Sequence, residues 1–163
     1  MRERHHQVNG WWLRYHPYFI AQLKDLVREV ERHKSKNPST YREKAATKRL
    51  LAIKRLIFTN IPANPSSDEF CGGGALGGSR RFWRRAKFYQ QYRLFFRYRE
   101  SATVIVYAWV NDESTKRAYG SQTDAYRVFA KMLNSGNPPD GWDALMRVAL
   151  DDAPIAPDDI DGA

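Results

Sequence analysis

The hydrophobic periodicity of this chain changes between Pro62 and Arg81, and that change constrains the fold more than any other feature. Before Pro62, apolar residues recur at the three- and four-residue spacing of amphipathic helices. After Arg81, aromatic and β-branched residues fill three successive segments of strand length, and the connections between them are short. Strands joined this closely pair antiparallel. We therefore predict an α+β fold in which helices stack on one face of a central antiparallel sheet.

The expected helices have recognisable start and stop signals. Pro17 suits the first position of one helix. Thr40 and Glu43 have the spacing of a capping box at the start of a second helix, which Pro62 ends. Two further helices are expected near the C-terminus, at residues 123–133 and 142–150. The expected strands are residues 9–15, 82–89, 92–99 and 103–110.

Charge divides the chain into a basic body and an acidic tail. The net charge is +9, from 27 basic and 18 acidic residues. Residues 151–163 hold five of the acids and no base, so residues 1–150 carry all 27 bases and only 13 acids, a net charge of +14. We expect residues 1–150 to form one domain and residues 151–163 to be a disordered tail. A body this basic attracts polyanions, because the release of counterions from phosphates favours association.

Other features of composition favour a cytoplasmic protein without membrane contact. The longest apolar run, residues 103–110, is far shorter than the ~18 residues of a membrane span. The N-terminus shows no apolar segment of the kind that a secretory signal needs. Cys71 is the only cysteine, which excludes an internal disulfide and fits a reducing compartment.

Residues 80–99 combine positive charge with aromatic rings and contain no acid. The bases are Arg80, Arg81, Arg84, Arg85, Lys87, Arg93, Arg97 and Arg99, interleaved with an equal number of aromatic residues. Because strand side chains alternate between faces, Arg85 and Lys87 share one face of their strand, and Arg93 shares a face of the next with Arg97. Like charges on paired strands repel, so we expect RNA phosphates to supply negative charge and the rings to stack bases. A solvated basic face over an aromatic core is the simpler alternative.

Other patterns in the sequence point less clearly to chemistry. The glycine-rich run at residues 72–79 lacks the lysine and the preceding strand of a phosphate-binding loop. No histidine has a partner at ligand spacing, so we expect neither a metal site nor a cofactor. Asp112, Glu113 and Asp124 have the side chains of an acid–base pair, but turn chemistry and a helix N-terminus explain them equally well.

RNA cleavage without a metal requires residue types that this basic stretch contains. A base removes the proton of the 2′-OH, which attacks the adjacent phosphorus; the phosphorane must be stabilised and the departing 5′-oxygen protonated. A lysine crowded by cations can act as the base, and arginine can hold the phosphate oxygens with its forked donors. Tyrosine can orient the phosphate or stack a base. The products of this reaction carry 2′,3′-cyclic phosphate and 5′-OH ends.

Two other functions use the same basic face. An RNA- or ribosome-binding module would bind without catalytic turnover. A DNA-binding repressor acting alone is less favoured, because no helix-turn-helix pattern is present and the basic residues fall on expected strands.

Several segments of the chain resemble the YhaV-type toxins of bacterial toxin–antitoxin systems, which belong to the RelE superfamily. Residues 82–88 and 92–98 resemble the strand pair of that superfamily. The supporting blocks are residues 8–11, 16–17, 44–48, 109–113, 117–120, 123–126 and 128–129. The resemblance extends from about Val8 to Trp142. It implies a RelE-like fold, with two N-terminal helices packed on a central antiparallel sheet and helices at the C-terminus.

The resemblance also implies a function and partners. It implies a toxin endoribonuclease that cleaves mRNA, either free or on the ribosome, and arrests growth until a cognate antitoxin neutralises it. The partner would be a PrlF-type antitoxin with an AbrB-like fold. Operator DNA would be bound only through the toxin–antitoxin complex. The sequence specifies neither the RNA sequence that is cut nor the stoichiometry of the complex.

Matched residue by residue, the resemblance assigns catalysis to Arg85, Lys87, Arg93, Arg117 and Tyr119. Lys87 is the expected general base, assisted by Arg85, and Arg93 is expected to contact the scissile phosphate. Arg117 is a candidate acid or second clamp, and Tyr119 orients or stacks the substrate.

Further residues of the basic stretch are expected to bind the RNA. These are Arg80, Arg81, Arg84, Arg97 and Arg99. The chain departs from the family at Gly74, where a lysine is frequent, and Arg80 and Arg81 are positioned in sequence to compensate. The acidic tail is a possible weak ligand of the basic face, although a solvated tail is the simpler interpretation.

Overall fold

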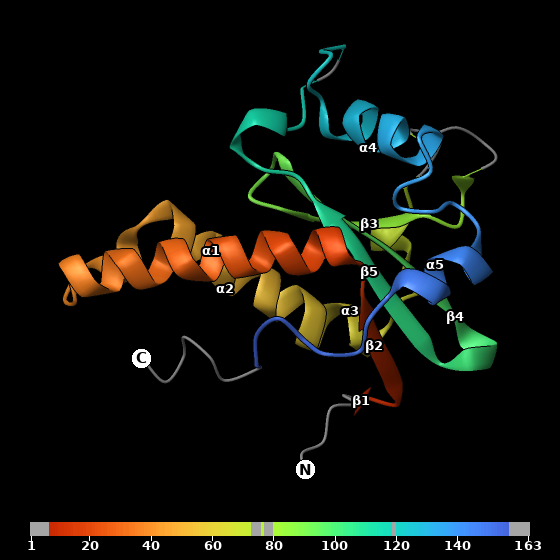
Figure 1. Cartoon of the computed structure of the whole chain (residues 1–163), viewed down its shortest axis with the longest axis horizontal. Coiled ribbons are helices and arrows are strands. Elements are labelled where there is room, and N and C mark those ends of the chain that lie inside the picture. Colours follow the sequence, from red (N-terminus) through yellow and green to blue (C-terminus); the bar gives the residue numbers. More distant parts are fainter. Residues whose placement is uncertain (1–6, 73–75, 77–79, 119, 157–163) are drawn as a thin grey trace.

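The computed structural model describes residues 7–72, 76, 80–118 and 120–156. Its centre is a five-stranded sheet in the order β1-β2-β5-β4-β3 (Figure 1). The strands are β1 (Gln7–Val8), β2 (Trp11–Tyr15), β3 (Arg84–Phe88), β4 (Tyr92–Arg99) and β5 (Val104–Val110). The last three form the predicted antiparallel meander.

The pairing of β2 with β5 is parallel, with Leu13 opposite Ile105. The prediction of an antiparallel sheet is therefore wrong for this pair, and the sheet is mixed. Adjacent parallel strands need a long crossover connection. The helices and the two intervening strands between residues 16 and 103 provide that connection, so the two strands run in the same direction.

Helices cover both faces of the sheet, as Figure 1 shows. The helices are α1 (Pro17–Lys36), α2 (Ala45–Arg55), α3 (Ile61–Ala63), α4 (Ala125–Asn134) and α5 (Trp142–Val148). The N-terminal helices α1 to α3 pack on one face, where Leu23, Leu50 and Phe96 belong to the first hydrophobic core. The C-terminal helices pack on the other face, where Phe129 and Leu145 belong to a second core. This three-layer arrangement agrees with the predicted α+β class, but the prediction that the helices stack on one face is wrong, because the C-terminal helices cover the opposite face.

The start of α2 differs from the prediction. Thr40 makes no capping hydrogen bond with its side chain, so the predicted capping box is wrong. A short 3₁₀ turn, Tyr41–Glu43, stands there instead, and Lys44 is the N-cap of α2. The buried hydroxyl of Thr47 donates to the carbonyl of Tyr41 at 2.8 Å, which ties this turn to the helix. Burial of the Tyr41 ring therefore fixes the approach to α2.

The other predicted boundaries are close to those observed. The α1 helix begins at Pro17 as expected. Pro62 lies within α3, after a wider π-helical turn at Leu56–Asn60, rather than ending α2 directly. Asp124 is the N-cap of α4, so this helix starts two residues after the predicted position.

An irregularity between β4 and β5 places aromatic rings against α4. Phe95 of β4 pairs with Trp109, but the next residue of β4 pairs with Tyr107, so Ala108 is an extra residue on β5. Ala108 and Trp109 consequently both face the second core. Phe129 of α4 stacks on Phe95 with a centroid separation of 4.3 Å and on Trp109 at 5.8 Å. This stack fixes α4 over β4 and β5.

The chain beyond α5 returns to the first core. The backbone of Leu150 exchanges two hydrogen bonds with that of Tyr15, at 2.7 and 2.8 Å. Ile155 is buried in the first core, although its segment begins the acidic tail that the sequence predicted to be disordered. Residues 157–163 of that tail lie outside the described residues. Within the described ranges, no helix has both the length and the apolar character needed to cross a membrane.

We expect the stability of α1 to depend on the protonation state of His16. Nδ1 of His16 accepts from the backbone N–H of Tyr18 at 3.0 Å and caps α1, and Nε2 lies 3.1 Å from Oδ1 of Asn137. Burial lowers the pKa of His16 below its usual value, and the hydrogen bond to Asn137 offsets this only in part. Protonation would remove the Nδ1 acceptor, so the contribution to the free energy of unfolding is complete above about pH 6.5 and is lost as the pH falls toward the lower pKa of the folded state.

Denaturant unfolding at pH 7.5 and at pH 5 tests this prediction. His16→Asn keeps a capping acceptor that does not titrate, so its stability should fall less over this interval than that of the parent, by about 1 kcal/mol. Equal losses in the two proteins would show that His16 does not carry the pH dependence.

Candidate functional site

The three basic residues predicted to lead the site lie on the sheet face that α4 covers. Arg85 and Lys87 belong to β3, and Arg93 of β4 is the direct cross-strand partner of Lys87. Lys87 is exposed, whereas the Arg93 side chain is buried at 7% exposure. The short hairpin between the two strands sets this juxtaposition, because Phe88 pairs with Tyr92 at its base. The structure therefore brings an exposed amine beside a buried guanidinium.

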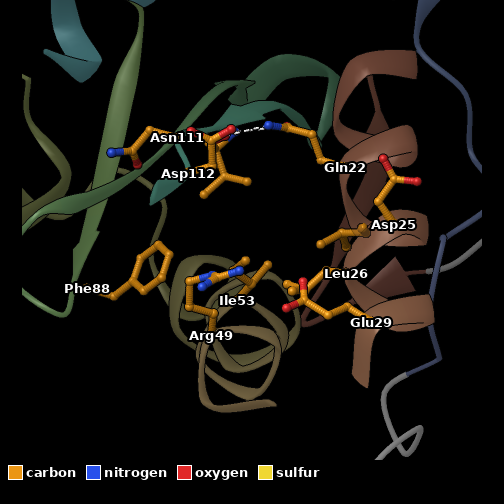
Figure 2. A pocket seen from close by; sticks show the side chains of 11 residues that line it. Gln22, Asp25, Leu26, Glu29, Arg49, Ile53, Phe88, Asn111 and Asp112 are labelled. Carbon is orange, nitrogen blue, oxygen red and sulfur yellow. Dashed lines mark hydrogen bonds between the residues drawn. The ribbon is translucent and has the colours of Figure 1, made fainter. Parts of the chain in front are cut away.

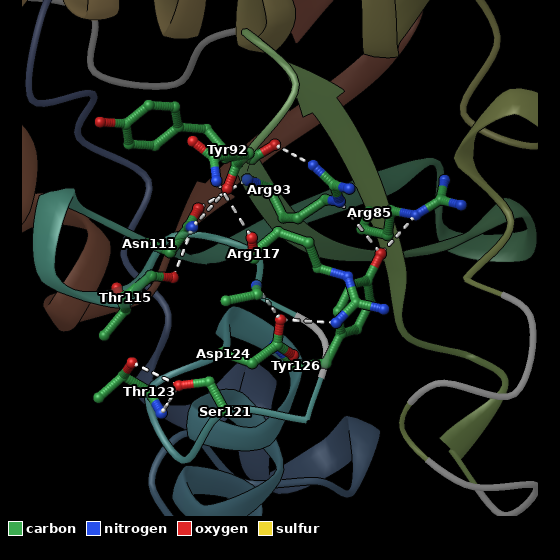
Figure 3. Close-up of polar contacts among 12 residues, drawn as sticks. Arg85, Tyr92, Arg93, Asn111, Thr115, Arg117, Ser121, Thr123, Asp124 and Tyr126 are labelled. Carbon is green, nitrogen blue, oxygen red and sulfur yellow. Dashed lines mark hydrogen bonds and ion pairs between the residues drawn. The ribbon is translucent and has the colours of Figure 1, made fainter.

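Tyr126, in the first turn of α4, connects the two strands of this basic group (Figure 3). Its hydroxyl oxygen accepts from Nε of Arg85 at 2.8 Å and from Nε of Arg93 at 3.2 Å. The guanidinium of Arg117 lies over the Tyr126 ring, 4.5 Å from its centroid. A phenol oxygen that accepts two hydrogen bonds keeps its own hydrogen for donation. Tyr126 thus orients two arginines and keeps its hydroxyl hydrogen available as a donor.

The two arginines are held by neutral oxygens rather than by carboxylates. Besides Tyr126, Arg85 donates to the carbonyl of Glu69 at 2.8 Å. Arg93 donates to the carbonyls of Gln90 and Tyr92 at 2.8 and 3.0 Å. Within the described residues, no ion pair neutralises either guanidinium. Both therefore keep their full positive charge while their orientation is fixed.

Asn111, the first residue after β5, locks the base of the hairpin. Its Oδ1 accepts from the backbone N–H of Arg93 at 2.6 Å. Its Nδ2 donates to the carbonyls of Gln91 and Thr115 at 3.0 and 2.8 Å. A side chain that is buried to 3% exposure with all three bonds satisfied fixes the backbone of Arg93 relative to the loop that carries Arg117.

Asp124 holds the other side of the site. One carboxylate oxygen accepts from Nη1 of Arg117 at 2.5 Å and from the backbone N–H of Ala118 at 2.6 Å. The second oxygen caps α4 by accepting from the backbone N–H of Tyr126 at 3.1 Å. Burial raises the pKa of Asp124, but these hydrogen bonds and the charge of Arg117 outweigh it, so the pKa lies below the ordinary value. Asp124 is therefore ionised at neutral pH and positions both Arg117 and Tyr126.

The carboxylates that the sequence offered as an acid–base pair are instead used separately. Asp112 caps a 3₁₀ turn through Ser114 and Thr115, so turn chemistry accounts for it. Glu113 accepts from the hydroxyl of Tyr92 at 2.8 Å and pairs with Arg49. The described residues contain no group of three or more His, Cys, Asp or Glu side chains arranged to hold a metal ion.

A cavity of about 260 Å³ opens between α1, α2 and the end of β5 (Figure 2). Its apolar wall includes Leu26, Ile53 and Phe88, which belong to or pack against the first core, on the other side of the sheet from Tyr126. The amide of Gln22 bonds both the N–H and the carbonyl of Val110 at its rim. The polar groups at the rim of the cavity already serve structural roles. The basic residues around Tyr126 are therefore the better candidate site.

The arginines predicted to bind RNA do not gather around Tyr126. Arg84 donates to the carbonyl of Ser67 and lies over the ring of Tyr98, which packs against the first core. Arg80 pairs with Asp140 at 3.4 Å and donates to Asn134. The remaining three, Arg81, Arg97 and Arg99, lie before β3 or toward the end of β4, where Arg97 is buried and Arg81 and Arg99 are exposed.

Two positions discussed in the sequence analysis lie where the structure gives no description, and one residue of the site was not predicted. Tyr119 and Gly74 lie outside the described residues. Tyr126 was not predicted as a site residue, because at helical spacing with Phe129 and Leu133 it reads as part of an apolar stripe. The available signal was its hydroxyl, since a tyrosine on the buried face of a helix needs a polar partner.

Comparisons with known proteins show which family the chain belongs to. A family described as a toxin with endonuclease activity, of a toxin–antitoxin system, matches residues 13–150. The chain is 50% identical over 143 residues to the ribonuclease toxin YhaV of Escherichia coli K12, covering 86% of this chain and 93% of that protein. It is 50% identical over 141 residues to the toxin YhaV of Escherichia coli O6:H1, covering 85% and 92%. No solved structure matches the chain.

The family match over residues 13–150 and the 50% identity along most of the chain define it as a toxin of a toxin–antitoxin system. More specifically, it belongs to the YhaV toxin family. Membership of such a system implies a cognate antitoxin as its partner.

The Tyr126 hydroxyl should contribute measurably to stability. Tyr126→Phe keeps the ring but leaves the Nε groups of Arg85 and Arg93 without their shared acceptor. We expect the free energy of unfolding to fall by about 1–3 kcal/mol, measured by denaturant titration. A double-mutant cycle with Arg85→Ala should show a coupling energy of at least about 0.5 kcal/mol. The matched control is Tyr98→Phe on the opposite face, and a loss as large in the control as in Tyr126→Phe would contradict this role.

Proposed function

We propose that this chain is a metal-independent endoribonuclease that cleaves mRNA by attack of the 2′-OH on the adjacent phosphate. The observation that carries the proposal is the convergence of Arg85 and Arg93 on the hydroxyl of Tyr126, with Lys87 opposite Arg93 on the neighbouring strand and no neutralising carboxylate on either arginine in the described residues. Such a group binds a phosphodiester and stabilises extra negative charge on it. The relative from Escherichia coli K12, named a ribonuclease toxin, supports the same substrate class.

Lys87 is the proposed general base. Arginine stays protonated in proteins, so neither Arg85 nor Arg93 can remove a proton. Lys87 is the remaining basic side chain of this group, and its exposure allows a substrate hydroxyl to reach it. In its neutral form it takes the proton of the 2′-OH, whose oxygen then forms the new bond to phosphorus.

Arg93 and Arg85 are the proposed phosphate clamp. Tyr126 and backbone carbonyls fix both guanidinium groups before substrate arrives, so little reorganisation is needed as charge develops on the phosphorane. Arg117, fixed by Asp124 and lying over Tyr126, is a second clamp rather than an acid, because a guanidinium does not release its proton.

The bond from phosphorus to the 5′-oxygen breaks as the cyclic phosphate forms, and that oxygen needs a proton. The hydroxyl hydrogen of Tyr126 is the proposed donor, since its oxygen already accepts from two arginines. Tyr119 keeps its proposed role in orienting or stacking the substrate. The products are one fragment with a 2′,3′-cyclic phosphate and one with a 5′-OH.

The proposed biological setting follows from family membership. Cleavage of mRNA, free or on the ribosome, arrests growth until an antitoxin of PrlF type with an AbrB-like fold covers the basic face. Operator DNA is bound through that complex. Charge supports such a partner, because an acidic segment placed over Lys87 and Arg93 would relieve the repulsion between them.

The substitution Lys87→Arg distinguishes the role of Lys87 in proton transfer from the role of its positive charge. It keeps a cation but removes the only proposed base, and the exposed position should tolerate the change. We expect RNA affinity within about twofold of the parent and a cleavage rate at least about 100-fold lower, within the range that general base catalysis contributes. Cleavage of a labelled single-stranded RNA in EDTA, with and without translating ribosomes, measures the rate.

Arg93→Ala should abolish cleavage as well, and it should also weaken RNA binding. The control is Arg28→Ala, which removes an exposed arginine of α1 that pairs with Asp25. If Lys87→Arg cuts as fast as the parent, the base is misassigned. If the parent binds RNA but cuts none in either assay, a binding module without turnover replaces this proposal.

A further inference from the structure

Phe82 presents an aromatic ring to solvent beyond the basic group around Tyr126. It is 72% exposed, the largest value among the exposed large hydrophobic side chains of the described residues. It precedes β3 by two residues, on the side where β4 ends. A single exposed apolar side chain needs no explanation by itself. The case for a site therefore rests on what surrounds the ring.

A buried cation lies behind the Phe82 ring. The guanidinium of Arg97 is 5.4 Å from the centroid of Phe82, and it also lies 5.5 Å from the ring centroid of Trp83 and 5.6 Å from that of Trp142. Arg97 is only 8% exposed. The cation thus holds one face of the Phe82 ring, while most of the ring remains accessible.

Among the described residues, no carboxylate forms an ion pair with this cation, although the nearby charge of Asp140 acts on it. Nη1 of Arg97 donates to the backbone carbonyl of Asp140, at 2.5 Å, and its buried Nε has no hydrogen-bond partner. The Asp140 carboxylate is already used by Nε1 of Trp83 at 2.7 Å and by Arg80 at 3.4 Å. The surroundings of Phe82 therefore retain positive charge.

Two exposed cations lie next to the aromatic residues around Arg97. Arg81 precedes Phe82 in the chain and is exposed. Arg99 is exposed too, and its guanidinium lies 4.8 Å from the ring centroid of Trp142. A stackable ring bordered by cations matches single-stranded nucleic acid, which offers flat bases and regularly spaced phosphates. An apolar peptide would leave these charges without partners.

We propose that Phe82 is a base-stacking subsite for single-stranded RNA, with Arg81 and Arg99 binding the phosphates on either side of the stacked base. This inference rests on the proposed function and extends its substrate path. Arg97 lies four positions after Arg93 on β4, about 13 Å along an extended strand. The subsite therefore holds nucleotides remote from the cleaved bond, and it contributes to affinity rather than to the chemical step.

Oligonucleotides of two lengths test the subsite. 2′-O-methyl RNA lacks the attacking hydroxyl, so fluorescence anisotropy of a labelled trinucleotide and a labelled dodecanucleotide reports binding to the full chain without cleavage. Phe82→Ala should weaken the dodecanucleotide about tenfold and the trinucleotide less than about twofold. Phe82→Trp should bind at least as tightly as the parent. Tyr18→Ala, which removes another exposed ring at the start of α1, is the matched control and should change neither affinity.

The salt dependence separates stacking from charge. Phe82→Ala should leave the slope of log affinity against log salt unchanged, whereas Arg81→Ala should reduce it by about one. With cleavable RNA, Phe82→Ala should raise KM and leave kcat unchanged.

The outcomes distinguish the subsite from the proposed function. If the parent binds the dodecanucleotide and Phe82→Ala binds it equally well, Phe82 is an ordinary surface residue and the subsite is overturned. Equal weakening of both oligonucleotides would also overturn it, because the effect would then come from the site around Tyr126. Failure of the parent to bind either RNA would overturn the subsite, and the absence of cleavage with translating ribosomes would separately overturn the proposed function.

Discussion

The structure depends on how it holds several cations close together without cancelling their charge. Arg85 and Arg93 lie on adjacent strands, where like charges repel. Neutral oxygens, from the hydroxyl of Tyr126 and from backbone carbonyls, accept their hydrogen bonds. A carboxylate in the same position would stabilise the fold more strongly but would compete with a phosphate. Asp124, the carboxylate of the site, instead binds Arg117 and caps α4.

One face of the sheet carries most of the hydrophobic core, and the other carries the basic residues of the candidate site. The face under α1 and α2 holds the larger core and supplies the rigid support. The other face carries the basic residues, and α4 completes it through the stack of Phe129 on Phe95 and Trp109. The extra residue Ala108 on β5 lets Trp109 join that stack. A local irregularity of one strand therefore determines where Tyr126 meets the arginines.

Much of this could be predicted from the sequence, because period-two and helical spacing are local properties. The meander, the start of α1 at Pro17 and the shared face of Arg85 and Lys87 all follow from such patterns. The parallel pairing of β2 with β5 could not be predicted, since it depends on how distant segments meet. The role of Tyr126 was hidden for the same reason: nothing in its own helix indicates that two arginines from the sheet donate to it. Thr40 and Glu43 have the spacing of a capping box, but the box does not form. The burial of Tyr41 places a 3₁₀ turn there instead.

The chemistry of the product ends tests the central claim most directly. Incubation of the full chain with single-stranded RNA in EDTA, supplemented with translating ribosomes if free RNA is not cut, should give fragments with 2′,3′-cyclic phosphate and 5′-OH termini. Those termini require attack by the neighbouring 2′-OH, which is the reaction that a base beside a cationic clamp supports. Fragments with 3′-OH and 5′-phosphate termini, or cleavage that appears only when a divalent metal is restored, would contradict the account.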